Sequence, residues 1–139
     1  MNQLAKAHAF CFYVLRITFR TVSRDGLEDW KALVVLSVAM EFTLLMIVTI
    51  VSIYLEHPVL LPASKGSFLT MWGLIGAGLV LLNQVTLVAG RKWRRFEREF
   101  QNYSKAMRVG SGIALWFTVI LLCLATFWTG SMAGKLPQN

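Results

Sequence analysis

The sequence predicts an all-α protein that crosses a membrane three times. Hydrophobic residues occupy 56% of the 139 positions and charged residues only 15%, whereas soluble domains average about 45–50% and about 25%. The hydrophobic residues form three long blocks, and most charged residues lie between those blocks. Composition and segmentation together predict a polytopic membrane protein.

Each hydrophobic block has the length of a transmembrane helix, because an α-helix needs roughly 20 residues to cross about 30 Å of hydrocarbon. The predicted spans are residues 32–55, 68–90 and 110–130. The remaining segments, 1–31, 56–67, 91–109 and 131–139, are too short to form a soluble domain of their own. We therefore expect one membrane domain over residues 1–139.

The first segment contains an amphipathic stretch, AHAFCFYVLRITF. Helical spacing places Phe12, Leu15 and Phe19 on one side, with Arg16 and Arg20 on another. This pattern is typical of a helix that lies in the membrane plane. The alternative is that the stretch packs on a neighbouring protein.

The 91–109 segment predicts a second amphipathic helix, basic on one side, between the second and third spans. Aromatic and large apolar residues recur there at intervals of three or four, which a helix would align on one face. They are Trp93, Phe96, Phe100, Tyr103 and Met107. Such a helix would lie on the bilayer or pack against the amino-terminal segment.

The distribution of basic residues predicts the orientation in the membrane. Of the 14 Lys and Arg residues, five lie in residues 1–31 and seven in residues 91–108, whereas the other two segments have one each. Basic segments remain in the cytoplasm. We therefore expect a cytoplasmic amino terminus, a cytoplasmic 91–109 segment, an external 56–67 loop and an external carboxyl terminus in a cell membrane.

Several side chains of the two cytoplasmic segments are predicted to contact the membrane surface or its anionic lipids. They are Arg16, Arg20, Arg91, Lys92, Trp93, Arg94, Arg95 and Arg98. Arginines interleaved with aromatic residues also occur in nucleic-acid-binding proteins, but no nucleic-acid motif accompanies them here. Membrane lipids are therefore the expected partners, and nucleic acid is not.

A few polar residues interrupt the spans at similar predicted depths. They are Glu41, Asn83, Gln84 and Thr118. A charged carboxylate at the bilayer centre costs on the order of 2.5–3.5 kcal/mol, so Glu41 is expected to face protein or water. Two interpretations stay open: a protonated Glu41 hydrogen-bonded to Asn83 or Gln84 within the bundle, or an ion or proton site.

The second span also has a face of small residues beside Asn83 and Gln84, formed by Gly73, Gly76 and Ala77. Small residues allow helix backbones to approach closely in membranes. We expect this face to be a helix-packing surface.

The sequence contains no recognised catalytic constellation, and we expect no enzymatic activity, cofactor, metal or small-molecule substrate. His8 and His57 fall on opposite sides of the membrane in the predicted topology, as do Cys11 and Cys123. This separation argues against a metal site or a disulfide within the chain.

The stretches DWKALVVLS and FEREFQNYSKAMRVGSGIALWFTVILL resemble small uncharacterised bacterial inner-membrane proteins with three predicted spans. In those proteins a charged loop leads into a last span with paired glycines. Here the pair is interrupted, because Ser111 separates Gly110 from Gly112. The resemblance implies a bacterial inner membrane and no particular activity.

The sequence leaves three hypotheses for function. The first is a small accessory or interaction subunit of a membrane complex, bound to other membrane subunits or to copies of itself. The second is a homo-oligomeric ion channel or pore-like effector lined by Glu41, Asn83 and Gln84. The third is an immunity-type protein that blocks a toxin in the membrane.

Overall fold

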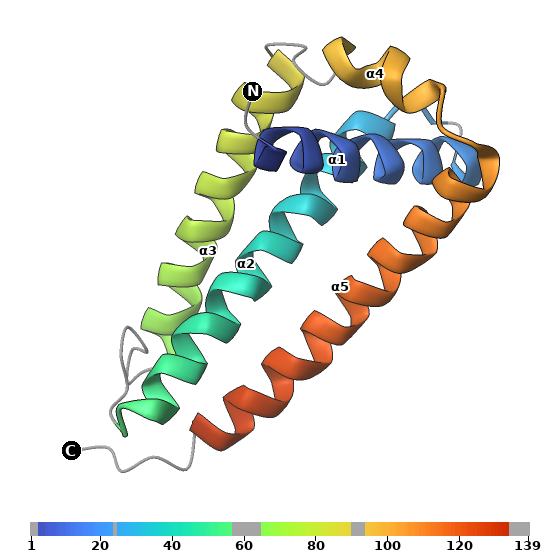
Figure 1. The fold of residues 1–139 in the computed structure, drawn as a ribbon. Helices are drawn as coiled ribbons and strands as arrows, with labels where there is room; N and C mark the ends of the chain where they lie inside the picture. Colours follow the sequence, from blue (N-terminus) through green and yellow to red (C-terminus); the bar gives the residue numbers. More distant parts are fainter. Residues whose placement is uncertain (1–2, 24, 57–64, 90–93, 134–139) are drawn as a thin grey trace. The chain divides into compact units, whose positions relative to one another are not determined.

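A computed structural model describes residues 3–23, 25–56, 65–89 and 94–133 of the chain (Figure 1). Within these ranges all regular structure is helical, which confirms the predicted all-α class. The helices are α1 (Gln3–Val22), α2 (Glu28–Tyr54), α3 (Lys65–Asn83), the π-helix η1 (Gln84–Ala89), α4 (Arg94–Gln101) and α5 (Lys105–Ala133).

Three of the helical segments are long and apolar enough to cross a membrane, as the sequence predicts. They are Glu28–Tyr54, Gly66–Ala89 and Lys105–Ser131. The first and third begin several residues before the predicted spans 32–55 and 110–130. The reason is local: each helix starts at a polar turn that precedes the hydrophobic block.

The turn before α2 contains a side-chain cap. The Asp25 carboxylate accepts a hydrogen bond from the Leu27 backbone N–H at 3.2 Å, and Gly26 adopts a φ of 76°, which favours glycine. Lys31, in the first turn of α2, forms an ion pair with Asp25. The Lys31 ammonium, followed by the Leu27 N–H, lowers the pKa of the Asp25 carboxyl to about 2.

The start of α5 corrects the prediction for residues 91–109, which expected one helix through this segment. α4 ends at Gln101, and α5 begins at Lys105. Between them, the Ser104 hydroxyl accepts a hydrogen bond from the Met107 N–H at 3.1 Å. A serine in this position is a favoured helix N-cap. Phe100 and Met107 therefore belong to different helices, although their spacing would suit a single one.

The chain divides into two compact units, and each span contributes to both. The first unit comprises Met1–Ser37 and Val80–Phe117, and the second comprises Val38–Leu79 and Thr118–Asn139. The first unit thus holds α1, η1, α4 and the adjoining parts of α2, α3 and α5. The second unit holds the remaining parts of the spans.

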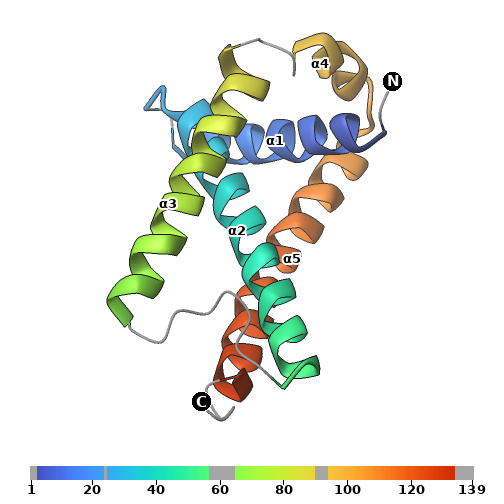
Figure 2. The ribbon, with the colours of Figure 1, turned by 90° about the vertical axis from the view of Figure 1, so that its left-hand side faces the viewer.

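α1 is enclosed by other elements of the first unit. Four consecutive residues of α1, Phe12 to Leu15, are buried, so the helix is covered on every side there. They share a hydrophobic core with residues from α2, η1 and α4: Ala32, Leu33, Leu36, Leu87 and Phe100. α4 lies on one side of α1, and the adjoining parts of α2 and α5 lie on the other (Figures 1 and 2).

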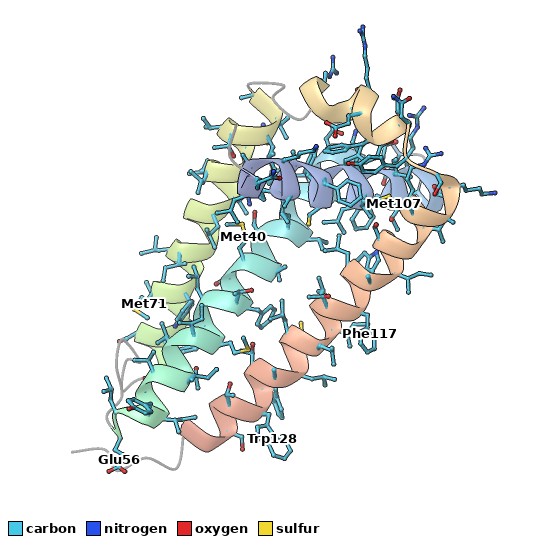
Figure 3. The ribbon with its side chains drawn as sticks, viewed as in Figure 1. Met40, Glu56, Met71, Met107, Phe117 and Trp128 are labelled. Carbon is cyan, nitrogen blue, oxygen red and sulfur yellow. The ribbon has the colours of Figure 1, made fainter. Side chains whose placement is uncertain are left out.

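The second unit buries few side chains. Its buried residues include Trp72 and the polar Thr49, Ser52 and Thr126. The Thr126 hydroxyl lies 2.7 Å from the Leu122 carbonyl in its own helix and 3.4 Å from the Phe42 carbonyl of α2. In contrast, Trp128 is 68% exposed and projects outward from α5 (Figure 3).

Candidate functional sites

Glu41 is the central residue of α2, thirteen residues from each end of Glu28–Tyr54. Its carboxyl group lies against the backbone of Gly76 on α3: a Cβ atom placed on Gly76 would be 2.6 Å from Glu41 Oε2 and 3.1 Å from Glu41 Cδ. Real Cβ atoms are not found this close to other atoms. Position 76 therefore admits the carboxyl group because it carries no side chain.

Among the residues that the structure describes, Glu41 has no hydrogen-bond or ion-pair partner. This is unusual, because polar groups removed from water are normally hydrogen-bonded. The side chain is partly buried rather than enclosed. Glu41 is therefore a polar group in the middle of a span with unused hydrogen-bonding capacity.

Asn83, at the carboxyl end of α3, is fully buried. Its side-chain amide donates a hydrogen bond of 2.8 Å to the Ser37 hydroxyl of α2, and that hydroxyl in turn donates to the Leu33 carbonyl at 2.8 Å. The sequence analysis proposed Glu41 as the partner of Asn83 or Gln84. The observed bond to α2 is made one turn earlier, at Ser37.

His8 of α1 lies beside this polar pair. Burial is the larger effect on His8 and lowers its pKa, while the neighbouring Asn83 side chain acts in the opposite direction. The buried His8 Nε2 atom has no hydrogen-bond partner among the described residues. The Asn83–Ser37 hydrogen bond thus joins α3 to α2 beside His8, inside the first unit.

His8 is not among the site residues predicted from the sequence. Its spacing could have indicated it: His8, Phe12 and Leu15 are separated by four and three residues, so all three fall on one helical face. A histidine on the buried face of an amphipathic helix is removed from water, which is why the pKa of His8 is lowered.

The remaining polar and small residues of the predicted sites are more exposed. Gln84, the first residue of η1, is half-buried, and Thr118 is exposed. In the small-residue face, a Cβ on Gly73 would meet nothing within 4 Å, and Ala77 is exposed. Of this face, Gly76 makes the close approach, and a packing role for Gly73 and Ala77 stays a prediction.

Ion pairs join α1 to its neighbours in the first unit. Arg16 pairs with Asp29 at the start of α2 and lies 3.9 Å from the Glu97 carboxylate of α4. Lys6, nearer the start of α1, pairs with Glu99 of α4. The hydrogen bond that Lys6 donates to the Glu99 carboxylate is the main reason that the pKa of Lys6 is raised.

An aromatic cluster lies between α1 and α4. The Phe10 ring contacts the Phe100 ring edge to face, with 5.1 Å between centroids, and contacts Tyr103 at 5.7 Å. Tyr13 lies 5.3 Å from Phe100. Phe100 is 1% exposed, and buried aromatic pairs contribute roughly 0.5–1.5 kcal/mol beyond their area. α4 is thus fixed to α1 by rings and ion pairs together.

The residues predicted to contact lipid differ in their surroundings. Arg16 forms ion pairs with Asp29 and Glu97. Arg20, Arg94 and Arg98 are exposed. Arg91, Lys92 and Trp93 lie outside the described residues, and so does the side chain of Arg95. Lipid contact by any of these residues stays a prediction.

The second unit contains an open apolar pocket of about 230 Å³ between α2 and α3. It is lined by Leu44, Val48, Met71, Trp72 and Ile75. Its lining suits an apolar group, such as a lipid chain or a side chain of a neighbouring helix. Within the described ranges, no three His, Cys, Asp or Glu side chains are grouped to hold a metal ion.

Comparisons with family models, with curated proteins and with solved structures give no match for this chain. The class of protein therefore comes from the fold. It is an all-α chain with three helices long and apolar enough to span a membrane.

Proposed function

We propose that the protein is a non-enzymatic accessory subunit of a membrane complex and that Glu41 binds a polar group of another membrane-spanning helix. The amino terminus and the 91–109 segment are cytoplasmic in this proposal, and the carboxyl terminus is external. The bacterial inner membrane implied by the sequence resemblance is its expected location.

The observation that carries this proposal is that the carboxyl group of Glu41 has no hydrogen-bond partner among the described residues. An isolated charge at the bilayer centre costs on the order of 2.5–3.5 kcal/mol, and an unsatisfied neutral carboxyl also carries a penalty. Since the described part of the chain supplies no hydrogen-bond partner, a second chain is the natural source of one. The carboxyl group could hydrogen-bond to one polar side chain on a neighbouring span: Asn, Gln, Ser, Thr, His or a basic residue.

The exposure of the spans supports the same proposal. In the most apolar stretch of each span, only 17%, 17% and 11% of the residues are buried within the chain. The rest of that surface is available to lipid and to partner helices.

The channel hypothesis is the second candidate, because a ring of Glu41 side chains in a symmetric oligomer would also give each carboxyl a polar environment. The position of Asn83 argues against its being one of the residues that line the pore. Asn83 is 0% exposed and bonded to Ser37, so it is committed to the interior of the first unit.

Purification in mild detergent, followed by mass measurement of the intact complex, tests the proposal. We expect a stable complex with at least one unrelated membrane protein. Glu41→Leu should weaken that complex by about 0.6–2 kcal/mol, the size of an intramembrane hydrogen bond. Glu41→Gln keeps the hydrogen-bonding capacity and should leave the complex almost unchanged.

Leu44→Ala is the matched control, because Leu44 is 43% exposed on the same helix and carries no polar group. A lone symmetric oligomer would contradict the accessory-subunit proposal. If such an oligomer also conducted ions in reconstituted bilayers, and Glu41→Gln abolished the current, the channel would replace it. Equal weakening by Glu41→Leu and Leu44→Ala would remove the specific role of Glu41.

A further inference from the structure

The seam between α2 and α3 in the second unit holds two chemically different features, the Glu41 carboxyl group and the apolar pocket. The carboxyl group lies against the Gly76 backbone, and the pocket of about 230 Å³ is lined by both helices. α2 and α3 run in opposite directions (Figure 1), so residues that follow Glu41 meet residues that precede Gly76. Leu44 and Trp72 line the pocket three and four residues away from this contact. The carboxyl group and the pocket therefore lie about one helical turn apart.

The pocket reaches the surface of the helix pair. Among its lining residues, Leu44 is 43% exposed and Trp72 is 6% exposed, so the lining extends from the surface into the interior. The Glu41 side chain is only partly buried. Both features are thus accessible to a molecule that lies alongside α2 and α3.

The two features together define the chemistry of an occupant. A lipid chain suits the pocket, but its hydrocarbon offers no hydrogen bond to Glu41, which has no hydrogen-bond partner among the described residues. An occupant that serves both features carries an apolar group and a polar group about one helical turn apart. A membrane-spanning helix has this arrangement, because side chains three or four positions apart are neighbours on one helical face.

We propose that one helix of the partner subunit lies along this seam, with a polar side chain on Glu41 and a large apolar side chain in the pocket. The two side chains are three or four residues apart in the partner sequence. This proposal rests on the function proposed above and specifies the partner helix. Packing in the pocket contributes to association, since close packing stabilises helix pairs in membranes, and the hydrogen bond to Glu41 sets the register of the two helices, as a single buried polar residue does in coiled coils.

Met71 allows a test with little change to the pocket, because it is one of the lining residues (Figure 3). The full-length chain is produced in its natural host with photo-methionine, whose diazirine group reacts with neighbouring molecules under ultraviolet light. Mass spectrometry then identifies the product at each methionine. We expect Met71 to be joined to one membrane-spanning segment of another protein, with a polar residue three or four positions from the attachment point. Met46 of α2, which is not a lining residue, is the internal control.

Two pairs of variants connect the pocket to Glu41. Glu41→Leu should lower the yield of the protein product at Met71 at least about threefold, the equivalent of a weak intramembrane hydrogen bond, and Glu41→Gln should retain it. Val48→Phe fills the pocket and should reduce the yield at Met71 to the level at Met46. Ile50→Phe is its matched control, because Ile50 is 48% exposed and lies about 160° around α2 from Val48.

Several results would overturn the proposal. Lipid as the main product at Met71 would assign the pocket to a lipid chain, and a second copy of this chain as the product would assign it to self-association. Equal yields in Glu41→Leu and Glu41→Gln would separate the pocket from the Glu41 contact. A stable complex with an unrelated membrane protein, combined with lipid products at Met71, would leave the proposed function standing. Absence of an unrelated protein both from the purified complex and from Met71 would overturn both proposals.

Discussion

Among the described glycines of the three long helices, Gly76 has the closest side-chain neighbour, the carboxyl group of Glu41. A Cβ at position 76 would lie 2.6 Å from Glu41 Oε2, whereas a Cβ at Gly78 would meet nothing within 4 Å. Both residues lie in the same helix, so a leucine at either position gains similar helix propensity. The difference between the two substitutions therefore isolates the contact with Glu41.

We predict that Gly76→Leu lowers the free energy of unfolding in detergent by about 1–3 kcal/mol, the usual cost of overpacking. Gly78→Leu should change it by less than about 0.5 kcal/mol. Combining Gly76→Leu with Glu41→Ala should recover at least half of the loss, because the obstructing carboxyl group is gone. Equal destabilisation at positions 76 and 78, or no recovery in the double variant, would show that the contact is unimportant.

His8 gives a pH-dependent prediction. Burial lowers the pKa of His8 in the folded protein, so the unfolded chain, with a histidine pKa of about 6.5, binds the proton more readily. The contribution of His8 to stability is complete above pH about 6.5 and is lost progressively as the pH falls below that value.

Melting temperatures of the wild type and His8→Gln between pH 8 and pH 5 measure this effect. The wild type should lose more stability than the variant on acidification, because glutamine is polar but has no titratable proton. Since the variant retains His57, the difference between the two curves belongs to His8. Parallel curves would contradict the assignment.

The hydrogen-bond partner of Asn83 could be predicted from the sequence only in part. Ser37 and Glu41 are four residues apart and share a helical face, so the pattern indicates the face of α2 that receives a polar neighbour. Which of the two residues meets Asn83 depends on the axial register of α2 and α3. That register is set by packing across the whole first unit, including the contact with His8.

At the scale of single elements, Ser104 defines the boundary between α4 and α5. Its hydroxyl caps α5 by accepting from the Met107 N–H at 3.1 Å. We predict that Ser104→Ala destabilises the protein by about 1 kcal/mol, the typical value of an N-cap. Ser104→Asp should retain most of the stability, because the carboxylate accepts the same bond and suits the positive end of the helix.

Thermal unfolding in detergent compares these two variants with the wild type, and hydrogen exchange of the first α5 amides locates the effect. If alanine and aspartate behave alike, the side chain of Ser104 does not determine where α5 begins.

The helices were predictable from sequence to different degrees. The three predicted spans follow from the length of the hydrophobic blocks alone, and the structure contains three helical segments long and apolar enough to cross a membrane. The break between α4 and α5 was not predictable from periodicity, because Phe100, Tyr103 and Met107 continue a helical spacing across it. A single capping hydrogen bond at Ser104 ends the pattern. Likewise, the burial of α1 on every side depends on α4, which an amphipathic pattern does not reveal.

At the scale of the whole molecule, the apolar spans and the basic segments have different surroundings in the proposed arrangement. The spans expose most of their apolar surface, and the proposed partner contact of Glu41 lies within that hydrophobic region. Ion pairs, aromatic rings and the hydrogen bond from Asn83 to Ser37 hold the first unit together. Basic residues gather in the two segments that the orientation rule assigns to the cytoplasm. The proposed function therefore requires three spans with that orientation.

Labelling of single cysteines in intact cells tests the three-span arrangement and its orientation. In a background with Cys11→Ser and Cys123→Ser, cysteines introduced at Ser64 and Gln138 should react with a membrane-impermeant maleimide added outside. A cysteine at Asn102, the exposed turn residue after α4, should react only after the cells are permeabilised. Labelling of Asn102→Cys from outside, or protection of Ser64→Cys and Gln138→Cys until permeabilisation, would contradict the proposed three-span arrangement and its orientation.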